Sequence, residues 1–490
     1  MAKGKFIKGA LWLTLTGAAL RAVGMAYRVY ISSKLGEEGM GLYQLILSVY
    51  MLGSAFASAG VAIAVTRLVS AQTVTGGSTG VRRTMRFSLL WSMGMGGAVA
   101  LVMFSGAPII AVRMIGDVTA AAGLRVLSLG LPFMAASACF NGYFLGVGRV
   151  RFSCYAQIAE QAVRIGCVVL LMERVASTHA LSVVFFGNAV SEIAAVGLLF
   201  LFYLADVKKL SPGGENTRNI YARFLPIQLP IAAGRYITSG LHTAENLLVP
   251  IQLGKFSGRS AALSDFGALK GMALPLIMFP SSFLSSLAGL LVPEITAAAA
   301  LHRHDQIKLL TRRTLLITFM FSVLMGGMFF RFAYPLADMI YGSESVGNIL
   351  RRLAPVIPFM YLDCITDGLL KGIGQQMASL RYSTCDSLIR ITLVFLLLSK
   401  TGLNGFLIVM VISNSSVALL GLRRLLKVTG CTAPWMQGVI LPLAAASLAH
   451  VLTLYISNLI VGAAVYLTVF VLFVLFSGAL DIREMKNLLR

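Results

Sequence analysis

The most regular feature of this chain is a succession of apolar stretches separated by short polar connections. A transmembrane helix needs roughly 20 apolar residues, because each residue advances about 1.5 Å along the helix axis. Stretches of this kind recur fourteen times, so the pattern predicts an all-α polytopic membrane protein with about 14 transmembrane helices. The stretches lie at 9–31, 42–66, 87–112, 122–146, 153–172, 180–204, 224–252, 267–292, 312–333, 349–373, 379–399, 403–426, 435–457 and 460–479.

The composition supports the same class. Of the 490 residues 57% are hydrophobic and only 12% are charged, and the mean hydropathy is +0.83, which excludes an ordinary soluble domain. The net charge of +22 does not indicate nucleic acid, because the basic residues fall between apolar stretches and form no single aromatic-interleaved patch. We therefore expect membrane lipids, and no nucleic acid, as partners.

Basic residues gather in alternate connections, which predicts the orientation of the chain. The intervening connections carry fewer cations and most of the loop acids, including Glu38 and Asp117. Because cytoplasmic loops are enriched in Lys and Arg, both termini are expected on the cytoplasmic side of a bacterial membrane. The basic connections hold Lys3, Lys5, Lys8, Arg82, Arg83, Arg86, Arg149, Arg151, Lys208, Lys209, Arg218, Arg223, Arg303, Lys308, Arg312, Arg313, Arg423, Arg424 and Lys427.

An internal repeat supports the helix count independently of hydropathy. Adding 226 to a position gives eleven identities over 41 aligned positions that begin with Arg125 and Arg351. Each repeat would hold six helices, so the two lobes would share one orientation about an axis along the membrane normal. We expect an N-terminal lobe at 1–215, a C-terminal lobe at 216–430 and two additional helices at 431–490. Two such lobes are typical of alternating-access transporters.

Cations inside the apolar stretches give the strongest functional signal. Arg21 and Arg28 are seven residues apart on one face of the first stretch, and Arg235 and His242 repeat this spacing in the seventh. Intramembrane cations are costly, so they usually serve a ligand pathway, and a guanidinium fork binds phosphate in two places. The predicted substrate-binding residues are Arg21, Arg28, Arg235, His242 and Lys270.

A second group of charges has a structural interpretation beside the functional one. Arg164 and Arg390 follow Glu160 and Asp386 by four residues, a spacing that favours an ion pair within one helix over contact with a ligand. Glu245 shares a face with Arg235 and His242. These five residues, Glu160, Arg164, Glu245, Asp386 and Arg390, are candidate cavity or ion-pair residues.

No motif for covalent chemistry is present. The sequence has no Walker A, GxSxG or HExxH pattern, and the six cysteines show no CxxC pairing. His302 and His304 form an HxH in a basic connection without a third ligand. We therefore expect a protein that is not an enzyme and has no catalytic residue, cofactor or metal.

Two segments carry a resemblance to a known family. FIKGALWLTLTGAALRAVGMAYRVYISSKLGEEGMGLYQLILSVY and GALKGMALPLIMFPSSFLSSLAGLLVPEIT look like the stage V sporulation protein B group of polysaccharide flippases, over essentially the whole chain. This group belongs to the superfamily that also holds multidrug and toxin extrusion carriers and lipid-linked peptidoglycan precursor flippases. The resemblance implies a two-lobed, 14-helix exporter of an undecaprenyl-pyrophosphate-linked precursor for the spore cortex. Cavity arginines in the first helix function in the precursor flippases, and Arg21 and Arg28 match that pattern.

Together these observations predict an alternating-access flippase that moves a polyprenyl-pyrophosphate-linked glycan from the inner to the outer leaflet. We expect a monomer, with cell-wall synthesis proteins as candidate partners. One alternative is a cation-coupled multidrug antiporter of the same fold, for which Glu192, Glu245, Asp363 and Asp367 would supply acids. Another is a non-transporting scaffold for cell-wall synthases, which would not need cationic helix faces.

Overall fold

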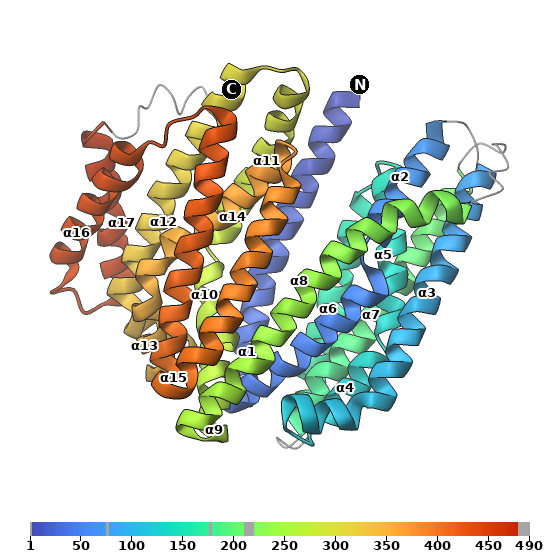
Figure 1. Cartoon of the computed structure of the whole chain (residues 1–490), viewed down its shortest axis with the longest axis horizontal. Helices are drawn as coiled ribbons and strands as arrows, with labels where there is room; N and C mark the ends of the chain where they lie inside the picture. The colour runs from blue at the N-terminus through green and yellow to red at the C-terminus, as the bar shows by residue number, and fades with distance from the viewer. Residues whose placement is uncertain (1, 75–77, 176–178, 210–219, 479–490) are drawn as a thin grey trace. The chain divides into compact units, whose positions relative to one another are not determined.

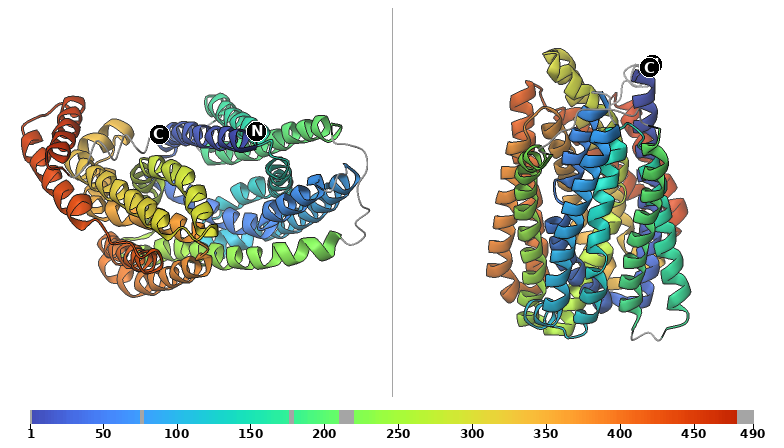
Figure 2. Two further views of the ribbon diagram at one scale, coloured as in Figure 1. Left: turned by 90° about the horizontal axis from the view of Figure 1, so that it is seen from above. Right: turned by 90° about the vertical axis from the view of Figure 1, so that its right-hand side faces the viewer.

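The computed structural model describes residues 2–74, 78–175, 179–209 and 220–478, and the regular elements within these ranges are helices. The chain forms two compact units, Met1–Pro250 and Ile251–Arg490 (Figure 1). Within each unit the long helices run roughly parallel to one another (Figure 2). Helices satisfy most of their backbone hydrogen bonds internally, as lipid surroundings require.

In the residues that the structure describes, unit 1 contains eight α-helices, the last of which continues past the unit boundary. The π-helical segment Ile110–Ile115 extends the third. The helices are α1 (Ala2–Ser58), α2 (Val61–Val74), α3 (Ser78–Ile109), α4 (Ala120–Ser128), α5 (Leu131–Gly146), α6 (Arg151–Met172), α7 (Ala180–Val207) and α8 (Ile220–Ser257).

Unit 2 contains the end of α8 and nine further helices in the described residues. They are α9 (Arg259–Phe266), α10 (Leu274–Met278), α11 (Ser281–Ala300), α12 (His304–Tyr341), α13 (Glu344–Leu353), α14 (Ile357–Gly372), α15 (Gln376–Thr429), α16 (Leu441–Thr453) and α17 (Leu459–Phe476). Short π or 3-10 segments join some of them, at Gly267–Ala273, Ala354–Val356 and Met436–Ile440.

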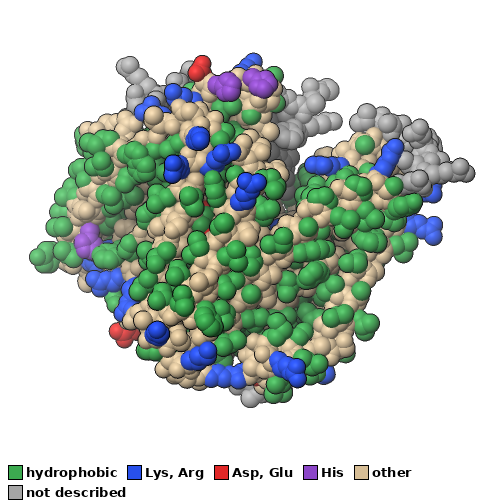
Figure 3. All heavy atoms as spheres, in the orientation of Figure 1, with side chains coloured by type: hydrophobic (Ala, Val, Ile, Leu, Met, Phe, Trp, Pro, Cys, Tyr) green, Lys and Arg blue, Asp and Glu red, His purple; other side chains and the backbone are tan. Residues whose placement is uncertain are grey.

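The predicted fold class is confirmed. Each of the fourteen apolar stretches is helical over most of its described length. Within the described ranges ten helices are long and apolar enough to cross a membrane, or eleven if the bent α4–α5 pair is one span. The count is below fourteen partly because continuous helices hold more than one stretch. Hydrophobic side chains cover much of the visible face, as a lipid-facing surface requires (Figure 3).

Two glycines break the longest helices between predicted spans. Gly36 in α1 has φ 67° and Gly402 in α15 has φ 60°, in the left-handed region that favours glycine. A Cβ atom at Gly402 would lie 2.6 Å from the ring of Phe256, so a larger side chain does not fit there. Gly402 therefore marks the turn between the eleventh and twelfth predicted stretches.

The core of unit 1 is aromatic and includes one buried acid. Tyr143 of α5 is fully buried among Phe144 and Tyr203, with ring centroids about 5 Å apart. Its hydroxyl donates to Oδ2 of Asp206 at 2.9 Å, and Arg149 forms an ion pair with the same carboxylate. Asp206 is only 2% exposed, so these two partners compensate its desolvation. They fix the α5–α6 connection to the end of α7.

In unit 2 the last two helices pack on α12. Tyr466 of α17 is fully buried and donates to the carbonyl of Ala446 in α16 at 3.2 Å. Gly327 of α12 accommodates this ring, because a Cβ atom there would lie 2.0 Å from the tyrosine hydroxyl. The described part of the predicted segment 431–490 therefore belongs to unit 2. The predicted lobe boundary after residue 215 stays a prediction, since α8 up to Pro250 groups with unit 1.

Equivalent contacts in the two units support the internal repeat. The hydroxyl of Ser70 donates to the carbonyl of Gly146 at 2.9 Å, and that of Thr296 donates to Gly372 at the same distance. Both residues of the second pair lie 226 positions after those of the first. The repeat seen in the sequence thus reappears as a repeated helix contact.

Candidate functional site

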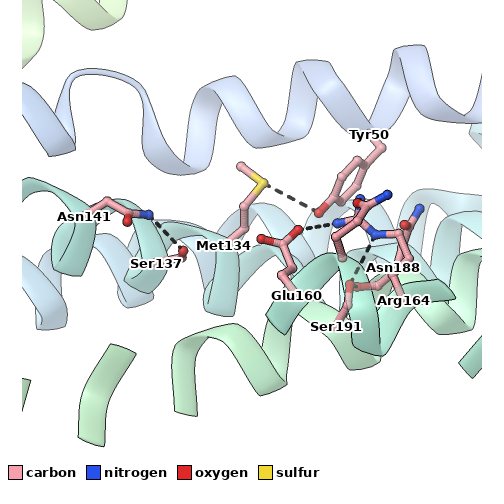
Figure 4. A network of polar contacts seen from close by, with 9 residues as sticks. Tyr50, Met134, Ser137, Asn141, Glu160, Arg164, Asn188 and Ser191 are labelled. Atoms are coloured by element: carbon pink, nitrogen blue, oxygen red, sulfur yellow. Dashed lines mark hydrogen bonds and ion pairs between the residues drawn. The ribbon is translucent and has the colours of Figure 1, made fainter. Parts of the chain in front are cut away.

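A network of polar side chains lies between α6 and α7 in unit 1 (Figure 4). Arg164 forms an ion pair with Glu160, and both side chains are 22% exposed. Its Nε donates to Oγ of Ser191 at 3.3 Å, and Nη1 donates to Oε1 of Gln161 at 3.2 Å. All three guanidinium nitrogens thus have partners inside the protein. Arg164 serves mainly to join these two helices.

Three tyrosines of α1 border this network. Tyr27, Tyr43 and Tyr50 are each no more than 9% exposed, and all three interact electrostatically with Arg164. Arg28 interacts electrostatically with Tyr43 as well. The structure therefore brings one predicted cavity cation, Arg28, to the same tyrosine that the α6 network contacts.

A matching network occupies unit 2. Nη2 of Arg390 lies 3.2 Å from Oδ2 of Asp386, and these side chains are 15% and 13% exposed. Nε of Arg390 donates to Oγ of Ser413 at 2.6 Å, and the serine hydroxyl donates to Asp386. The acid and the arginine each lie 226 positions after their unit 1 counterparts, Glu160 and Arg164. An ion pair completed by a serine is therefore duplicated in the chain, although Ser413 lies beyond the Gly402 break of the same helix, α15.

Each network includes a further acid, so carboxylates outnumber guanidinium groups. In unit 1, Glu192 interacts electrostatically with Glu160 and Arg164. In unit 2, Asp363 interacts in the same way with Asp386 and Arg390. These interiors are therefore suited to cations and less suited to an anionic ligand.

The other predicted site residues of unit 1 lie on α1 and α8. Arg21, Arg235 and His242 are exposed, Arg28 is half-buried, and Glu245 is 1% exposed. Helix α8 contacts α1 at several places, and Ser48 of α1 takes part in two of the hydrogen bonds. Its carbonyl accepts from Thr243 and its hydroxyl accepts from Asn246, both at 3.0 Å. The exposed cations of α8 therefore sit on a helix whose neighbouring positions pack against α1.

Lys270 belongs to unit 2, whereas the four other predicted substrate-binding residues belong to unit 1. It is half-buried in the π-helical segment Gly267–Ala273, and its Nζ lies 5.7 Å from the ring centroid of Phe406. π-Helical turns often occur at functional sites. A single site that combines Lys270 with the cations of unit 1 stays a prediction.

The residues that complete these two networks were not predicted from the sequence. Ser191 comes from α7, the helix after the ion pair, and Ser413 comes from the part of α15 beyond the Gly402 break. Tyr43 and Tyr50 did leave a signal, because they are seven residues apart in an apolar stretch and so share one helical face. In the part of the chain that the structure describes, no three His, Cys, Asp or Glu side chains are placed to hold a metal ion.

Comparisons with known proteins identify a matching family and several relatives of this chain. A family model described as polysaccharide biosynthesis protein matches residues 6–298. Stage V sporulation protein B of Bacillus subtilis (strain 168) is 24% identical over 417 residues, which cover 82% of this chain and 80% of that protein. This relative confirms the resemblance that the sequence showed.

Two further likenesses concern lipid II flippases. A Bacillus subtilis (strain 168) protein named lipid II flippase MurJ is 24% identical over 402 residues, covering 76% of this chain and 73% of that one. A solved structure of lipid II flippase MurJ in an inward closed conformation has a TM-score of 0.74 and 14% identity. It covers 98% of this chain and 100% of the other, so the two proteins share a fold.

Proposed function

The chain belongs to the polysaccharide biosynthesis protein family, and on this premise we propose that it is a flippase for a lipid-linked glycan. Its substrate would be an undecaprenyl-pyrophosphate-linked peptidoglycan precursor, moved from the inner to the outer leaflet of the bacterial cytoplasmic membrane. The names of the two curated relatives, a sporulation protein and a lipid II flippase, support this substrate and a role in the spore cortex. The protein would act as a monomer, in contact with cell-wall synthesis proteins.

The observation that carries the proposal is the series of cations on α1 and α8. Arg28 and Arg235 form no ion pair with a carboxylate of the described residues, whereas Arg164 and Arg390 do. Their charge is therefore available to an anion, and a guanidinium fork matches phosphate geometry. In this proposal the pyrophosphate binds Arg21, Arg28 and Arg235, with His242 and Lys270 as further donors.

The two ion-paired networks have a different role in this mechanism. Because Arg164 bonds to Ser191 of α7 and Arg390 bonds to Ser413 beyond the Gly402 break, the two networks would stabilise each unit as it moves. The substrate would then be exposed alternately to the two leaflets by motion of one lobe against the other. No covalent step is required, since only the position of the lipid changes.

A flipping assay tests the proposal directly. Purified protein is reconstituted into vesicles with a fluorescent undecaprenyl-pyrophosphate disaccharide, and the fraction accessible to an external reagent is followed over time. The wild type should accelerate transfer, and the Arg21→Ala, Arg235→Ala double variant should lose most of this activity. Arg67→Ala, which removes an exposed cation from the middle of α2, is the matched control. Wild-type flipping by the double variant would place the anion site elsewhere and refute this mechanism.

The acids of the two networks favour a second candidate function, a cation-coupled antiporter. Glu192 and Asp363 lie beside other carboxylates in the interior of each unit. If the chain exports cationic drugs, vesicles should accumulate ethidium when a proton or sodium gradient is applied, and Glu192→Gln should abolish it. Accumulation without any glycan flipping would support the antiporter over the flippase.

A further inference from the structure

Unit 2 contains a cavity of about 440 Å³ between α12, the start of α14 and the added helix α16. Its wall is almost entirely apolar, with Ser447 and His450 among its few polar side chains. Leu443 and Val451 on its rim are 50% and 55% exposed, so the cavity opens to the outside of the bundle. In a membrane protein, an apolar opening of this kind faces lipid chains.

Cationic side chains surround one end of this cavity. The ring of Phe330 lies 5.8 Å from the ring of His450 and 5.3 Å from Cζ of Arg351. Arg351 also stacks on Tyr334 at 5.7 Å, and its side chain is exposed. His450 interacts electrostatically with both Arg331 and Arg351. The apolar cavity therefore ends beside two guanidinium groups and the ring of His450.

The two arginines of this group differ in availability. Nη2 of Arg331 donates to the carbonyl of Thr453 at 2.6 Å and to that of Leu454 at 3.3 Å, at the end of α16. Arg331 thereby caps this helix, whose terminal carbonyls lack partners within it. No carboxylate among the described residues forms an ion pair with Arg351. One guanidinium group is thus left to bind an external anion.

The internal repeat places an equivalent cation–π pair in unit 1. Phe104 and Arg125 lie 226 positions before Phe330 and Arg351, and Cζ of Arg125 is 5.7 Å from the phenylalanine ring. The cation–π pair is therefore duplicated. The added helices α16 and α17 pack on α12 in unit 2, and side chains of both line the cavity beside Phe330 of the second copy.

We propose that this cavity binds one acyl chain of an anionic phospholipid, whose phosphate is held by Arg351 and His450. A phosphodiester carries one negative charge, which matches the single available guanidinium better than a more highly charged pyrophosphate does. The histidine ring can donate a second hydrogen bond to the phosphate. The bound chain would fill the space between α12 and α16 and so attach the added helices more firmly to unit 2. This site does not depend on the glycan substrate proposed above.

Native mass spectrometry of the full chain with phosphatidylglycerol or phosphatidylcholine tests the proposal. The wild type should retain one phosphatidylglycerol more tightly than phosphatidylcholine. Arg351→Gln should weaken its retention by about tenfold or more, as expected for loss of a charge-assisted contact. Ser447→Phe should weaken retention of this lipid by filling the cavity, and Arg351→Lys should retain part of the affinity. Arg125→Gln, which alters the equivalent cation–π pair in unit 1, should bind as the wild type does.

Several results would overturn the proposal. Equal retention of the two phospholipids would exclude recognition of the anionic head group. An equal loss in the Arg125→Gln and Arg351→Gln variants would mean that the cavity gives no selectivity. Retention of undecaprenyl phosphate with no retention of phosphatidylglycerol would assign the cavity to the carrier lipid. Because Ser447→Phe leaves every cation in place, it tests the cavity even if Arg351→Gln folds poorly.

Discussion

At the scale of single residues, Asp206 illustrates how a buried charge is tolerated. Its carboxylate is 2% exposed and depends on Tyr143 and Arg149 for compensation. In unit 2 the position 226 residues after Arg149 is Gln375, whose Oε1 accepts from Nη2 of Arg424 at 2.7 Å. In unit 1 the connection between α5 and α6 is thus fixed to the end of α7. In unit 2 the connection between α14 and α15 is fixed to the last part of α15, although the charges differ.

Replacing Arg149 by Ala should therefore be strongly destabilising. It leaves the Asp206 carboxylate buried with only the tyrosine hydroxyl, and breaking a buried pair from one side costs roughly 3–5 kcal/mol. The measurement is thermal unfolding of the purified variant in detergent. Arg174→Ala, which removes an exposed arginine from the same unit, is the control and should unfold as the wild type does. Equal stability of the two variants would contradict a compensating role for Arg149.

A second prediction at this scale concerns the cations proposed to bind substrate. Arg21→Ala or Arg235→Ala should remove a charge-assisted phosphate contact worth roughly 1.5–3 kcal/mol, and so weaken substrate binding by about one to two orders of magnitude. Arg→Lys should rescue binding only partly, since a point charge replaces a fork. Binding of an undecaprenyl-pyrophosphate disaccharide by purified variants measures this. Membrane insertion should be unharmed, because losing an intramembrane charge relieves a cost.

At the scale of helices, the glycine breaks in α1 and α15 differ in their surroundings. Gly402→Ala should destabilise the protein through backbone strain, about 1–3 kcal/mol, and also through a clash with Phe256. Gly36→Ala is the matched control, because it has comparable strain and no neighbour within 4 Å of its Cβ position. Thermal unfolding should rank Gly402→Ala as the less stable variant. Phe256→Ala should recover part of the loss, and no recovery would exclude the clash.

The orientation of the helices is a further prediction, since it rests on charge alone. Single cysteines placed near Arg83, Lys208 and Arg424 in a cysteine-free background should resist an impermeant thiol reagent added outside intact cells. A cysteine near Glu38 should react, because it falls in a connection poor in cations. Permeabilised cells supply the control, in which exposed sites of both groups become labelled. External labelling of the first three positions would reverse the proposed topology.

At the scale of the whole molecule, the repeat predicts two lobes of the same topology. Residues 6–215 and 220–430 should superpose with six helices each in the same order, because an even number of spans preserves orientation. An experimental structure of the protein in a membrane mimetic measures this. Inverted halves, or halves with unequal numbers of helices, would contradict the repeat.

The sequence predicted the helices well because lipid imposes helical structure on any apolar stretch of sufficient length. It also predicted the ion pair between Glu160 and Arg164, since residues four positions apart lie on one face of a helix. It could not identify Ser191 or Ser413, because Ser191 reaches its pair from α7 and Ser413 reaches its pair from beyond the Gly402 break in α15. The glycine breaks were equally hidden, because 48 glycines occur in the chain and only the path of the backbone distinguishes Gly402.

The duplicated hydrogen bonds have an evolutionary consequence. The contact made by Ser70 in one copy is made by Thr296 in the other, and Glu160 is replaced by Asp386. The chain thus keeps a record of substitutions that each position has accepted since the copies diverged. Both copies keep a hydroxyl at the first position and a carboxylate at the second, and they differ in the length or branching of the side chain.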